Sequence, residues 1–421
     1  MLELTADQGT IRLSGNVPDG LPGVEPDPRS KSARAPAWRY GDLQRALSER
    51  AIPFDDHVLD LPALDCTSTY ELREYQQTAL DAWLDTDDQR AAGSDATDTS
   101  RLRGCRGVLE LPTGSGKTVI GIAAIERLGT PTLVVVPTID LLEQWREELE
   151  TEFEEPIGQF GGGEQRREPI TVSTYDSAYL RAEDVSDAFG LVIFDEVHHL
   201  GGEGYRDIAR LLAAPARLGL TATFERPDGA HETIEELVGP LVHRIEIDEL
   251  AGEHLAAYDI KRRSVSLSPE EREAYERNQE VFTDYLAQSN IQLHSGSDYQ
   301  ELVKRSGTDP RARAALLAKQ RARDVMMHAD GKVTELEQIL DRHRDDRVIV
   351  FTASTDLVYR LSERFLLPAI THETPTAERR AILERFRDGT YSRVVTANVL
   401  NEGKAEIHNT NFGDNQALSV Q

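Results

Sequence analysis

The segment LELPTGSGKT, from Leu109 to Thr118, restricts the fold of this chain more than any other part of its sequence. An apolar stretch enters a glycine-containing turn, and a helical pattern follows from Val119 and ends at Gly129. Backbone N–H groups of such a turn can surround phosphates, the lysine can reach the outer phosphates, and the threonine hydroxyl can hold Mg²⁺. We therefore predict an ATP-binding loop with Mg²⁺, against the plainer alternative of a glycine turn before an ordinary helix. The loop residues predicted to bind ATP are Pro112, Thr113, Gly114, Ser115, Gly116, Lys117 and Thr118.

A second polar motif follows an apolar run at residues 191–194, which predicts a buried strand. Asp195, Glu196 and His198 come at its C-terminal end, where parallel α/β sheets bind ligands. Asp195 fits a Mg²⁺ carboxylate beside Thr118, Glu196 a base that orients the attacking water, and His198 a contact of the γ-phosphate. An Asp-Glu pair alone more often marks a solvated loop, and His199 is more simply an ordinary histidine. Together with the upstream turn, the motif predicts Lys117, Asp195 and Glu196 as the catalytic residues.

Apolar strands alternate with helical patterns in the first half of the chain, which is typical of a parallel α/β sheet. The predicted strands are residues 107–111, 132–136, 170–173, 191–194 and 217–220. From Ser268 the pattern is helical, because Ser268, Pro269 and Glu271 form a capping box with proline at the first helical position. Helices are predicted from there to Gln288 and at residues 310–328 and 332–343.

A second α/β unit begins with an apolar strand at residues 348–351. Strands at 368–371 and 393–397 and a helix at 377–387 are predicted to follow. The last eighteen residues, 404–421, are polar, and we expect neither a strand nor a long helix in them. Nearer the N-terminus, residues 42–50 have a helical pattern, and the acidic segment 84–100 predicts a solvated loop.

The composition argues against several classes of protein. No apolar run approaches the ~18 residues of a spanning helix, and no export signal is visible, so we expect a cytoplasmic protein without a membrane partner. Two cysteines cannot form a disulfide framework or a four-ligand metal site. The net charge is −27, and only seven of the 47 basic residues are lysine. This balance suits a halophile at molar salt, where the Debye length is ~3 Å and net charge no longer excludes DNA.

Several further motifs, in the same order along the chain, make the sequence resemble superfamily 2 helicases. LREYQ at residues 72–76 resembles the segment that reads adenine, which implies ATP contacts from Arg73 and Gln76. The string VVVPT at 134–138, with Gln144 and Trp145, resembles the first strand-contacting motif, and GGG at 161–163 with ITVSTY at 170–175 resembles the next two. Residues matching the motif that couples hydrolysis to the second domain are Thr221, Ala222 and Thr223.

Within that superfamily the chain is most similar to the archaeal XPB-type DNA repair helicases, over roughly residues 72–403. The likeness adds Arg226-Pro227-Asp228, which is similar to a family Arg-Glu-Asp tripeptide tied to duplex opening. Because proline replaces the central acid, only Arg226 and Asp228 carry over as DNA-binding residues. The family implies an α/β fold with a RecA-like parallel-sheet P-loop NTPase lobe, a helical insertion and a second RecA-like lobe, which is incomplete here.

The corresponding domains divide the chain into four. Residues 1–70 are a small N-terminal region, interpreted as a shortened damage-recognition domain, and 71–245 are the ATP-binding lobe. Residues 246–335 are a thumb-like helical insertion, and 336–421 are the truncated second lobe. The family string TANVLNEG at 396–403 is followed here by KAEIH, and the expected Gln-x-x-Gly-Arg-x-x-Arg motif is absent. We therefore expect ATP binding with negligible DNA-stimulated hydrolysis.

Local positive charge favours DNA, single-stranded or forked, as the partner of a monomeric protein. Residues 304–323 contain seven basic side chains and one acidic residue, and those assigned to DNA are Arg311, Arg313, Arg321 and Arg323. The alternative is a solvated helix face paired with acidic neighbours. A second basic patch comprises Arg29, Lys31, Arg34 and Arg39, with the same alternative.

Two rival functions stay open. One is another superfamily 2 motor, either a restriction translocase or an RNA helicase. The other is a catalytically inactive truncated remnant that binds ATP and DNA. Nuclease or repair partners are not specified by the sequence.

Overall fold

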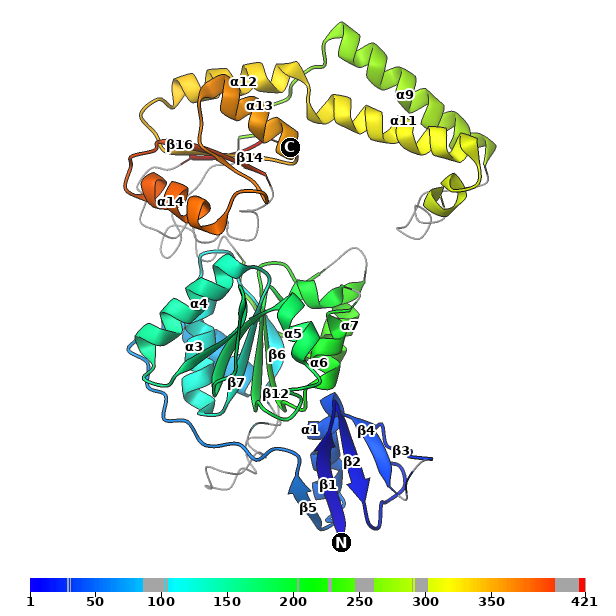
Figure 1. Ribbon diagram of the computed structural model, residues 1–421, viewed down its shortest axis with the longest axis vertical. Helices are drawn as coiled ribbons and strands as arrows, with labels where there is room; N and C mark the ends of the chain where they lie inside the picture. Colours follow the sequence, from blue (N-terminus) through cyan, green and yellow to red (C-terminus); the bar gives the residue numbers. More distant parts are fainter. Residues whose placement is uncertain are drawn as a thin grey trace. The chain divides into compact units, whose positions relative to one another are not determined.

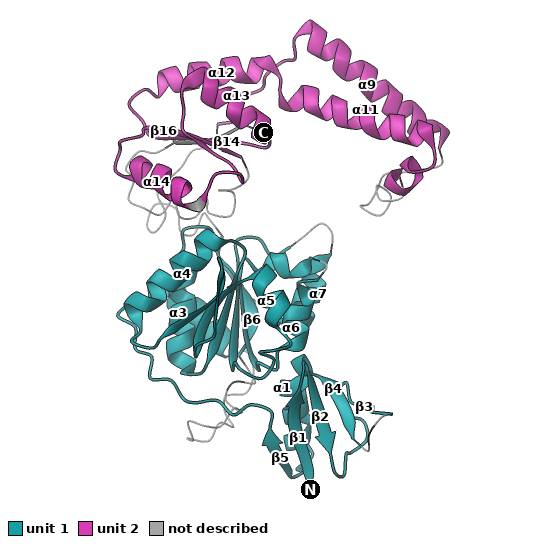
Figure 2. Cartoon of the chain, in the orientation of Figure 1, with its two compact units in different colours: residues 1–257 teal, residues 258–421 magenta. Residues whose placement is uncertain are grey.

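The computed structural model describes residues 1–28, 30, 32–85, 102, 105–202, 204–225, 229–246, 261–289, 291, 302–397 and 416–420. The chain forms two compact units, Met1–Ala257 and Tyr258–Gln421 (Figures 1 and 2). Among the helices in these described ranges, none is both long and apolar enough to cross a membrane.

An eight-stranded sheet forms the centre of the first unit, in the order β13-β6-β12-β11-β7-β10-β8-β9. All pairings in it are parallel except that of β8 with β9. The five strands predicted from apolar runs are confirmed. The strands are β6 (Arg106–Glu110), β7 (Thr132–Val136), β8 (Ile157–Gly161), β9 (Glu164–Arg166), β10 (Ile170–Thr174), β11 (Leu191–Asp195), β12 (Ala216–Thr221) and β13 (Leu241–Arg244).

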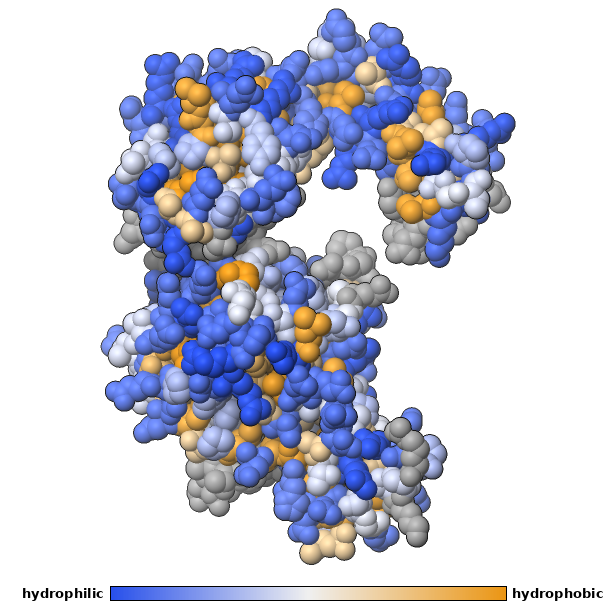
Figure 3. Space-filling model, viewed as in Figure 1, coloured by the Kyte–Doolittle hydropathy of each residue, from blue (hydrophilic) through white to orange (hydrophobic). Residues whose placement is uncertain are grey.

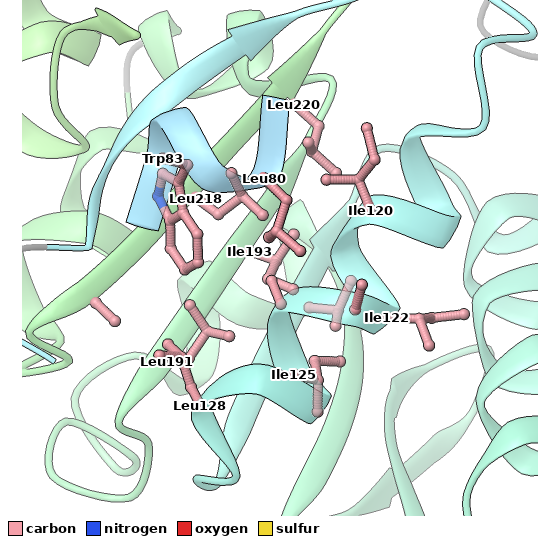
Figure 4. Close-up of a cluster of buried hydrophobic side chains, with 14 of the residues drawn as sticks. Leu80, Trp83, Ile120, Ile122, Ile125, Leu128, Leu191, Ile193, Leu218 and Leu220 are labelled. Atoms are coloured by element: carbon pink, nitrogen blue, oxygen red, sulfur yellow. The ribbon is translucent and has the colours of Figure 1, made fainter. Parts of the chain in front are cut away.

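Helices cover both faces of this sheet, so successive residues of a central strand are buried in different cores. Leu191 and Ile193 of β11 pack with α2 and α3 (Figure 4), whereas Val192 and Phe194 belong to the core on the other face. The helices are α2 (Glu74–Leu84), α3 (Lys117–Leu128), α4 (Ile139–Glu152), α5 (Tyr175–Arg181), α6 (Arg206–Leu211) and α7 (Ala230–Leu237), with a 3-10 turn η4 (Val197–Gly201).

The first unit also contains a small N-terminal sheet, in the order β3-β4-β2-β1-β5. One helix packs on it and confirms the helical pattern near residue 42. A shared core joins this sheet to the larger one, because Ala213, which follows α6, is buried among Leu4, Ile11 and Leu43. The elements are β1 (Leu2–Asp7), β2 (Thr10–Ser14), β3 (Glu25–Pro26), β4 (Ala33–Pro36), the turn η1 (Ala37–Arg39), α1 (Tyr40–Glu49) and β5 (Phe54–His57).

The chain between the two sheets is held against the larger one. The N–H of Leu64 donates to the carbonyl of Gly129 at 2.9 Å. The hydroxyl of Ser68 and the N–H of Thr69 donate to the Glu152 carboxylate at 2.7 and 2.6 Å. This connection therefore lies along α3 and α4 before it enters α2.

The second unit begins with two long antiparallel helices, α9 (Pro269–Gln288) and α11 (Pro310–Met327). The predicted capping box is confirmed, because Ser268 Oγ accepts from Glu271 N and Glu271 Oε2 accepts from Ser268 N. Small side chains bring the helices together, with Ala312, Ala315 and Ala318 buried along α11. We refer to this pair as the helical hairpin.

A four-stranded parallel sheet, in the order β15-β16-β14-β17, forms the rest of the second unit. The expectation that no strand follows residue 404 is wrong, because β17 pairs with β14 and places Gln416 opposite Val348. The strand pairs through the open backbone edge of β14, which a side-chain pattern does not reveal. The elements are α12 (Asp330–Arg342), β14 (Val348–Thr352), α13 (Thr355–Phe365), β15 (Ala369–Ile370), α14 (Thr376–Arg387), β16 (Arg393–Ala397) and β17 (Gln416–Val420).

Candidate nucleotide-binding site

The glycine-containing turn, residues 111–116, joins β6 to α3 at the C-terminal edge of the sheet. Gly114 and Gly116 have φ values of 82° and 78°, in the left-handed region that glycine adopts without strain. A Cβ atom on Gly116 would lie 2.5 Å from Nε2 of Gln76, so only glycine fits there. Ser115 is 1% exposed, and its Oγ has no hydrogen-bond partner among the described residues. The turn is thus a backbone cradle with an unpaired hydroxyl beside it.

Gln76 and Tyr75, at the start of α2, hold this turn in place. The Gln76 side chain donates to the carbonyl of Ser115 at 2.8 Å, and the Tyr75 hydroxyl donates to the same oxygen at 2.7 Å. Gln76 Oε1 also accepts from the backbone N–H of Arg73 at 2.9 Å, which caps the helix. The Arg73 side chain is exposed and donates to Tyr75 Oη at 3.3 Å.

Lys117 and Glu196 form a buried ion pair between the first turn of α3 and the end of β11. Lys117 Nζ lies 3.7 Å from Glu196 Oε1 and donates to the carbonyl of Leu111 at 3.4 Å. Glu196 has a φ of 47°, which is strained for a residue with a side chain. Such strain concentrates at functional sites, where the surrounding structure maintains it.

His198 joins Glu196 to the end of β12. Its Nδ1 atom lies 3.4 Å from Glu196 Oε2 and 3.3 Å from Thr221 Oγ1. Thr221 Oγ1 in turn donates to the carbonyl of Thr223 at 3.0 Å, and Ala222 lies between them, partly buried. Burial favours a higher pKa for Glu196, but the hydrogen bond from His198 and the charge of Lys117 outweigh it and lower the pKa. Glu196 is therefore held as a carboxylate.

Asp195, beside Glu196, is fixed through both carboxylate oxygens. Its Oδ1 accepts from the N–H of Glu196 at 3.0 Å, and its Oδ2 accepts from the indole N–H of Trp145 at 2.8 Å. The Tyr175 hydroxyl donates to the Asp195 carbonyl at 3.1 Å. Burial and the neighbouring Glu196 charge raise the pKa of Asp195 to about 6.

Trp145 and Glu110 take part in this site in ways that sequence reasoning missed. Trp145 was expected within a strand-contacting motif, but it is fully buried and bound to Asp195. Glu110 accepts from Arg244 Nε at 2.6 Å and from the N–H of Phe224 at 3.2 Å, and so ties β6 to β13 and to the segment after Thr223. The available signal for Glu110 was its carboxylate within an otherwise apolar strand.

The described residues of this site fit the binding of Mg²⁺ and a nucleoside triphosphate. Left-handed glycines form a cradle that a Cβ would fill, an unpaired Ser115 hydroxyl lies beside it, and Lys117 supplies positive charge. Thr118 lies in the first turn of α3, and Asp195 ends β11. A hydroxyl and a carboxylate are therefore available, and oxygen ligands are those that Mg²⁺ prefers. The arrangement suits positioning of phosphates and of a water that attacks them.

None of the residues assigned to DNA is among the described residues that form the nucleotide site. Arg226 and Asp228 lie outside the described residues, as does the string after residue 397. The four arginines of α11 belong to the second unit and are exposed, and none of them forms an ion pair in the described structure: Arg311, Arg313, Arg321 and Arg323.

The second basic patch does not form a free positive surface in the part that the structure describes. Arg34 pairs with Asp7 at 2.6 Å and with Asp27 at 3.1 Å. Arg39 pairs with Asp42 at 3.0 Å. The other two residues of the patch, Arg29 and Lys31, lie outside the described residues.

A parallel sheet with a phosphate cradle after one strand and an Asp-Glu pair after another defines a P-loop nucleoside triphosphatase with the motif order of superfamily 2 helicases. Three family descriptions match successive parts of the chain. They are the type III restriction enzyme res subunit at residues 69–226, the xeroderma pigmentosum group B helicase damage recognition domain at 4–58, and the helicase conserved C-terminal domain at 331–404.

The chain belongs to the XPB family of DNA 3′–5′ helicases and translocases. It is 40% identical to DNA 3′–5′ translocase XPB2 of Sulfurisphaera tokodaii, over 91% of this chain and 83% of that protein. It is 31% identical to a putative DNA 3′–5′ helicase Rad25 of Halobacterium salinarum, over 87% and 53%, and 28% identical to DNA 3′–5′ helicase XPB of Mycobacterium tuberculosis, over 86% and 56%. The aligned region thus spans about half the length of the last two relatives.

Proposed function

We propose that this protein is an ATP-dependent DNA translocase that moves 3′–5′ and uses the site between the glycine turn and β11 to hydrolyse Mg·ATP. The observation that carries the proposal is the unbroken series of contacts from Lys117 through Glu196 and His198 to Thr221. The series connects the phosphate cradle to the segment that couples hydrolysis to the second lobe in this family. Its relatives are named for 3′–5′ translocation or unwinding, which supports the direction.

In this mechanism each residue has a separate task. The turn N–H groups and Lys117 bind the β- and γ-phosphates, and Glu196 orients the attacking water. Thr118 and Asp195 would hold Mg²⁺, which neutralises charge on the phosphates when bound. His198 lies between Glu196 and Thr221 and transmits the state of the γ-phosphate from one to the other. Arg73 and Gln76 bind the base of the nucleotide.

The test of the nucleotide site is the affinity for a fluorescent ATP analogue in molar KCl. Lys117→Ala should weaken binding severely, because the cradle loses its only side-chain cation among the described loop residues. Glu196→Gln should bind the analogue normally but lose hydrolysis. Lys261→Ala, at an exposed lysine outside the site, is the control. Equal affinity of the wild type and Lys117→Ala would refute the assignment.

We also propose that the helical hairpin grips DNA phosphates. Its four α11 arginines are exposed and form no ion pair with the residues that the structure describes, and Leu317 between Arg313 and Arg321 is 44% exposed. The chain has a net charge of −27, and salt screens the long-range repulsion between this charge and DNA, while close contacts between a local basic face and phosphates are screened less.

Reversing the four arginines to glutamate tests this role. DNA binding should weaken, and the slope of log K against log[KCl] should flatten by about 0.9 for each lost duplex phosphate contact. The control reverses Arg272 and Arg277, which are exposed on α9. An unchanged slope in the four-fold variant, or the same change in the control, would assign these arginines to a solvated face.

Three further points belong to the same proposal. The N-terminal sheet, within the match to the damage recognition domain, contributes to recognition of damaged DNA. The protein acts as a monomer in the cytoplasm of a halophile. Stimulation of its ATPase by DNA but not by RNA would exclude the RNA helicase alternative. ATP binding without DNA-stimulated hydrolysis would instead support the inactive alternative that the absent arginine motif predicts.

A further inference from the structure

The strongest unassigned feature of the nucleotide site is the hydrogen bond between Trp145 and Asp195. It joins two residues that lie fifty positions apart, on α4 and at the end of β11. Both are buried, and the N···O distance is 2.8 Å. A buried partner of a metal-binding carboxylate fixes the orientation of the ligand, and loss of such a partner commonly costs 10–100-fold in metal affinity or activity.

The buried Trp145 indole packs closely against α3. Gly121 of α3 faces the ring, and a Cβ there would lie 2.5 Å from the Trp145 Cη2 atom. The ring is therefore held between α3 and the end of β11, so a displacement of α4 must change the hydrogen bond to Asp195. Among the described residues, the other Asp195 oxygen accepts from the next peptide N–H, that of Glu196.

The start of the same helix lies at the sheet edge. Thr138 caps α4 by accepting from the N–H of Leu141 at 3.3 Å, and residues 138–141 are partly exposed. Residues 134–138 are the segment that resembles a strand-contacting motif. The segment that resembles a strand-contacting motif thus leads directly into α4, whose first turn is partly exposed and which bonds to the proposed metal ligand about two turns later.

We propose that Trp145 is a positioning residue that orients the Asp195 carboxylate and transmits DNA binding at the start of α4 to the nucleotide site. This inference rests on the proposed function, because it requires both Mg·ATP and DNA as ligands. It goes beyond that function by naming the indole N–H as the connection between the two sites.

The chain offers a matched control. Trp83 is also fully buried in the core that contains Trp145, and its indole N–H donates to the carbonyl of Arg217 at 3.0 Å. Trp145→Phe and Trp83→Phe therefore remove the same atoms and one buried hydrogen bond each. Only the first removes a bond to Asp195.

The experiment measures binding of a fluorescent ATP analogue to the full chain while Mg²⁺ is titrated, with and without single-stranded DNA. Trp145→Phe should need about tenfold more Mg²⁺ for half-saturation, and DNA should no longer change its affinity for the analogue. Trp83→Phe should behave as the wild type in both respects. Equal behaviour of the two variants would overturn the proposal, whereas absence of Mg²⁺-dependent binding in the wild type would instead refute the proposed function.

A second measurement uses the unaltered protein, in case Trp145→Phe does not fold. The chain has three tryptophans, so the indole N–H region of a ¹H–¹⁵N spectrum contains three signals to assign. Addition of Mg²⁺ with the analogue should shift the Trp145 signal and leave the Trp83 signal in place. A Trp145 signal that does not respond would contradict the proposal.

Discussion

At the scale of single residues, charged groups of the nucleotide site pair with one another, and ligand binding must replace some of these contacts. Lys117 pairs with Glu196 and donates to the Leu111 carbonyl. Burial of Asp195 disfavours its charged form and raises its pKa. Groups with displaced pKa values of this kind mark functional sites. The site therefore lowers the stability of the fold in order to keep its chemistry available.

Asp195 gives a testable form of that conflict. The pKa of Asp195 is raised from 3.8 to about 6 by burial, so below about pH 4 the carboxyl is protonated in both states and contributes no penalty. Between these values the penalty of the buried charge grows, and above about pH 6 it is complete. Removal of this charge by Asp195→Asn relieves a penalty on the order of 2 kcal/mol near neutral pH, from which the loss of one accepted hydrogen bond is subtracted, because the amide NH₂ cannot accept from Trp145 or from the Glu196 N–H. The effect of the substitution on stability should therefore be more favourable near neutral pH than at lower pH.

Urea unfolding in EDTA at about pH 7.5 and about pH 5 measures this difference. Asp55→Asn, at an exposed carboxylate, is the control and should change stability at neither pH. An effect of Asp195→Asn that is independent of pH would contradict the assignment.

At the scale of elements, β12 carries two functions at its two ends. Its C-terminal end presents Thr221 to His198, and near its start Arg217 is fully buried without a carboxylate partner in the described structure. Burial lowers the pKa of Arg217. Its guanidinium donates to carbonyls at the ends of α6 and α7 and in the turn that follows α6. The partial negative charge of helix C-termini favours a cation at this place. These carbonyls belong to Ala209, Leu212, Ala214 and Leu237.

Arg217→Met should consequently destabilise the first unit severely. The substitution removes the guanidinium donor from the carbonyls of Ala209, Leu212 and Ala214, whereas the Leu237 carbonyl still accepts from Arg106 at 3.0 Å. Each buried group left unsatisfied costs about 1–3 kcal/mol. We expect a loss of at least about 3 kcal/mol in urea unfolding. Arg210→Met, which removes an exposed pair with Asp207, should cost less than about 0.5 kcal/mol, and equal losses would disprove the role of Arg217.

Leu366 should be a site of easy stabilisation. It follows α13 with a φ of 54° and is 89% exposed, so its side chain imposes backbone strain and contributes almost no packing. Leu366→Gly should stabilise the second unit by about 0.5–1 kcal/mol, because glycine is the preferred residue in this left-handed position. Leu317→Gly, in the middle of α11, should cost about 1 kcal/mol; a loss from both changes would show that the turn is not strained.

The elements that the sequence predicted are those with a local signal. The run 132–136 is buried at every position, and an apolar run is enough to recognise such a strand. The strand β17 and the N-terminal sheet mix polar with apolar residues, and their pairing depends on distant backbone edges. The same limit applies to the site: the glycine turn is readable in ten residues, but no local pattern connects Trp145 with Asp195.

At the scale of the whole molecule, charge dominates the surface. Hydrophilic side chains cover most of the face shown in Figure 3, and 74 acidic residues oppose 47 basic ones. Such an excess destabilises a compact state through self-repulsion unless salt screens it. The many arginine–carboxylate pairs, such as Arg34 with Asp7 and Asp27, offset part of that repulsion locally.

The thermal midpoint of unfolding should therefore rise with KCl. Most of the rise is expected between about 0.1 and about 1 M, because the Debye length falls from ~10 to ~3 Å over that range. Differential scanning calorimetry across this series measures the effect, with sucrose as a control for solvent exclusion. A midpoint that is flat or falls with salt would show that the acidic surface is not adapted to high ionic strength.

The core shared by Ala213 and the N-terminal sheet also limits how this protein can be taken apart or recombined. The sheet is not an independent module, since its core includes Ala213 from the turn that follows α6. Transfer of this sheet to another motor protein would require the turn with Ala213 to be transferred as well. It would also require the Glu152 side chain, which binds Ser68 and Thr69 of the connecting segment. Gains and losses of this sheet during evolution would then have to be accompanied by matching changes between α6 and β12.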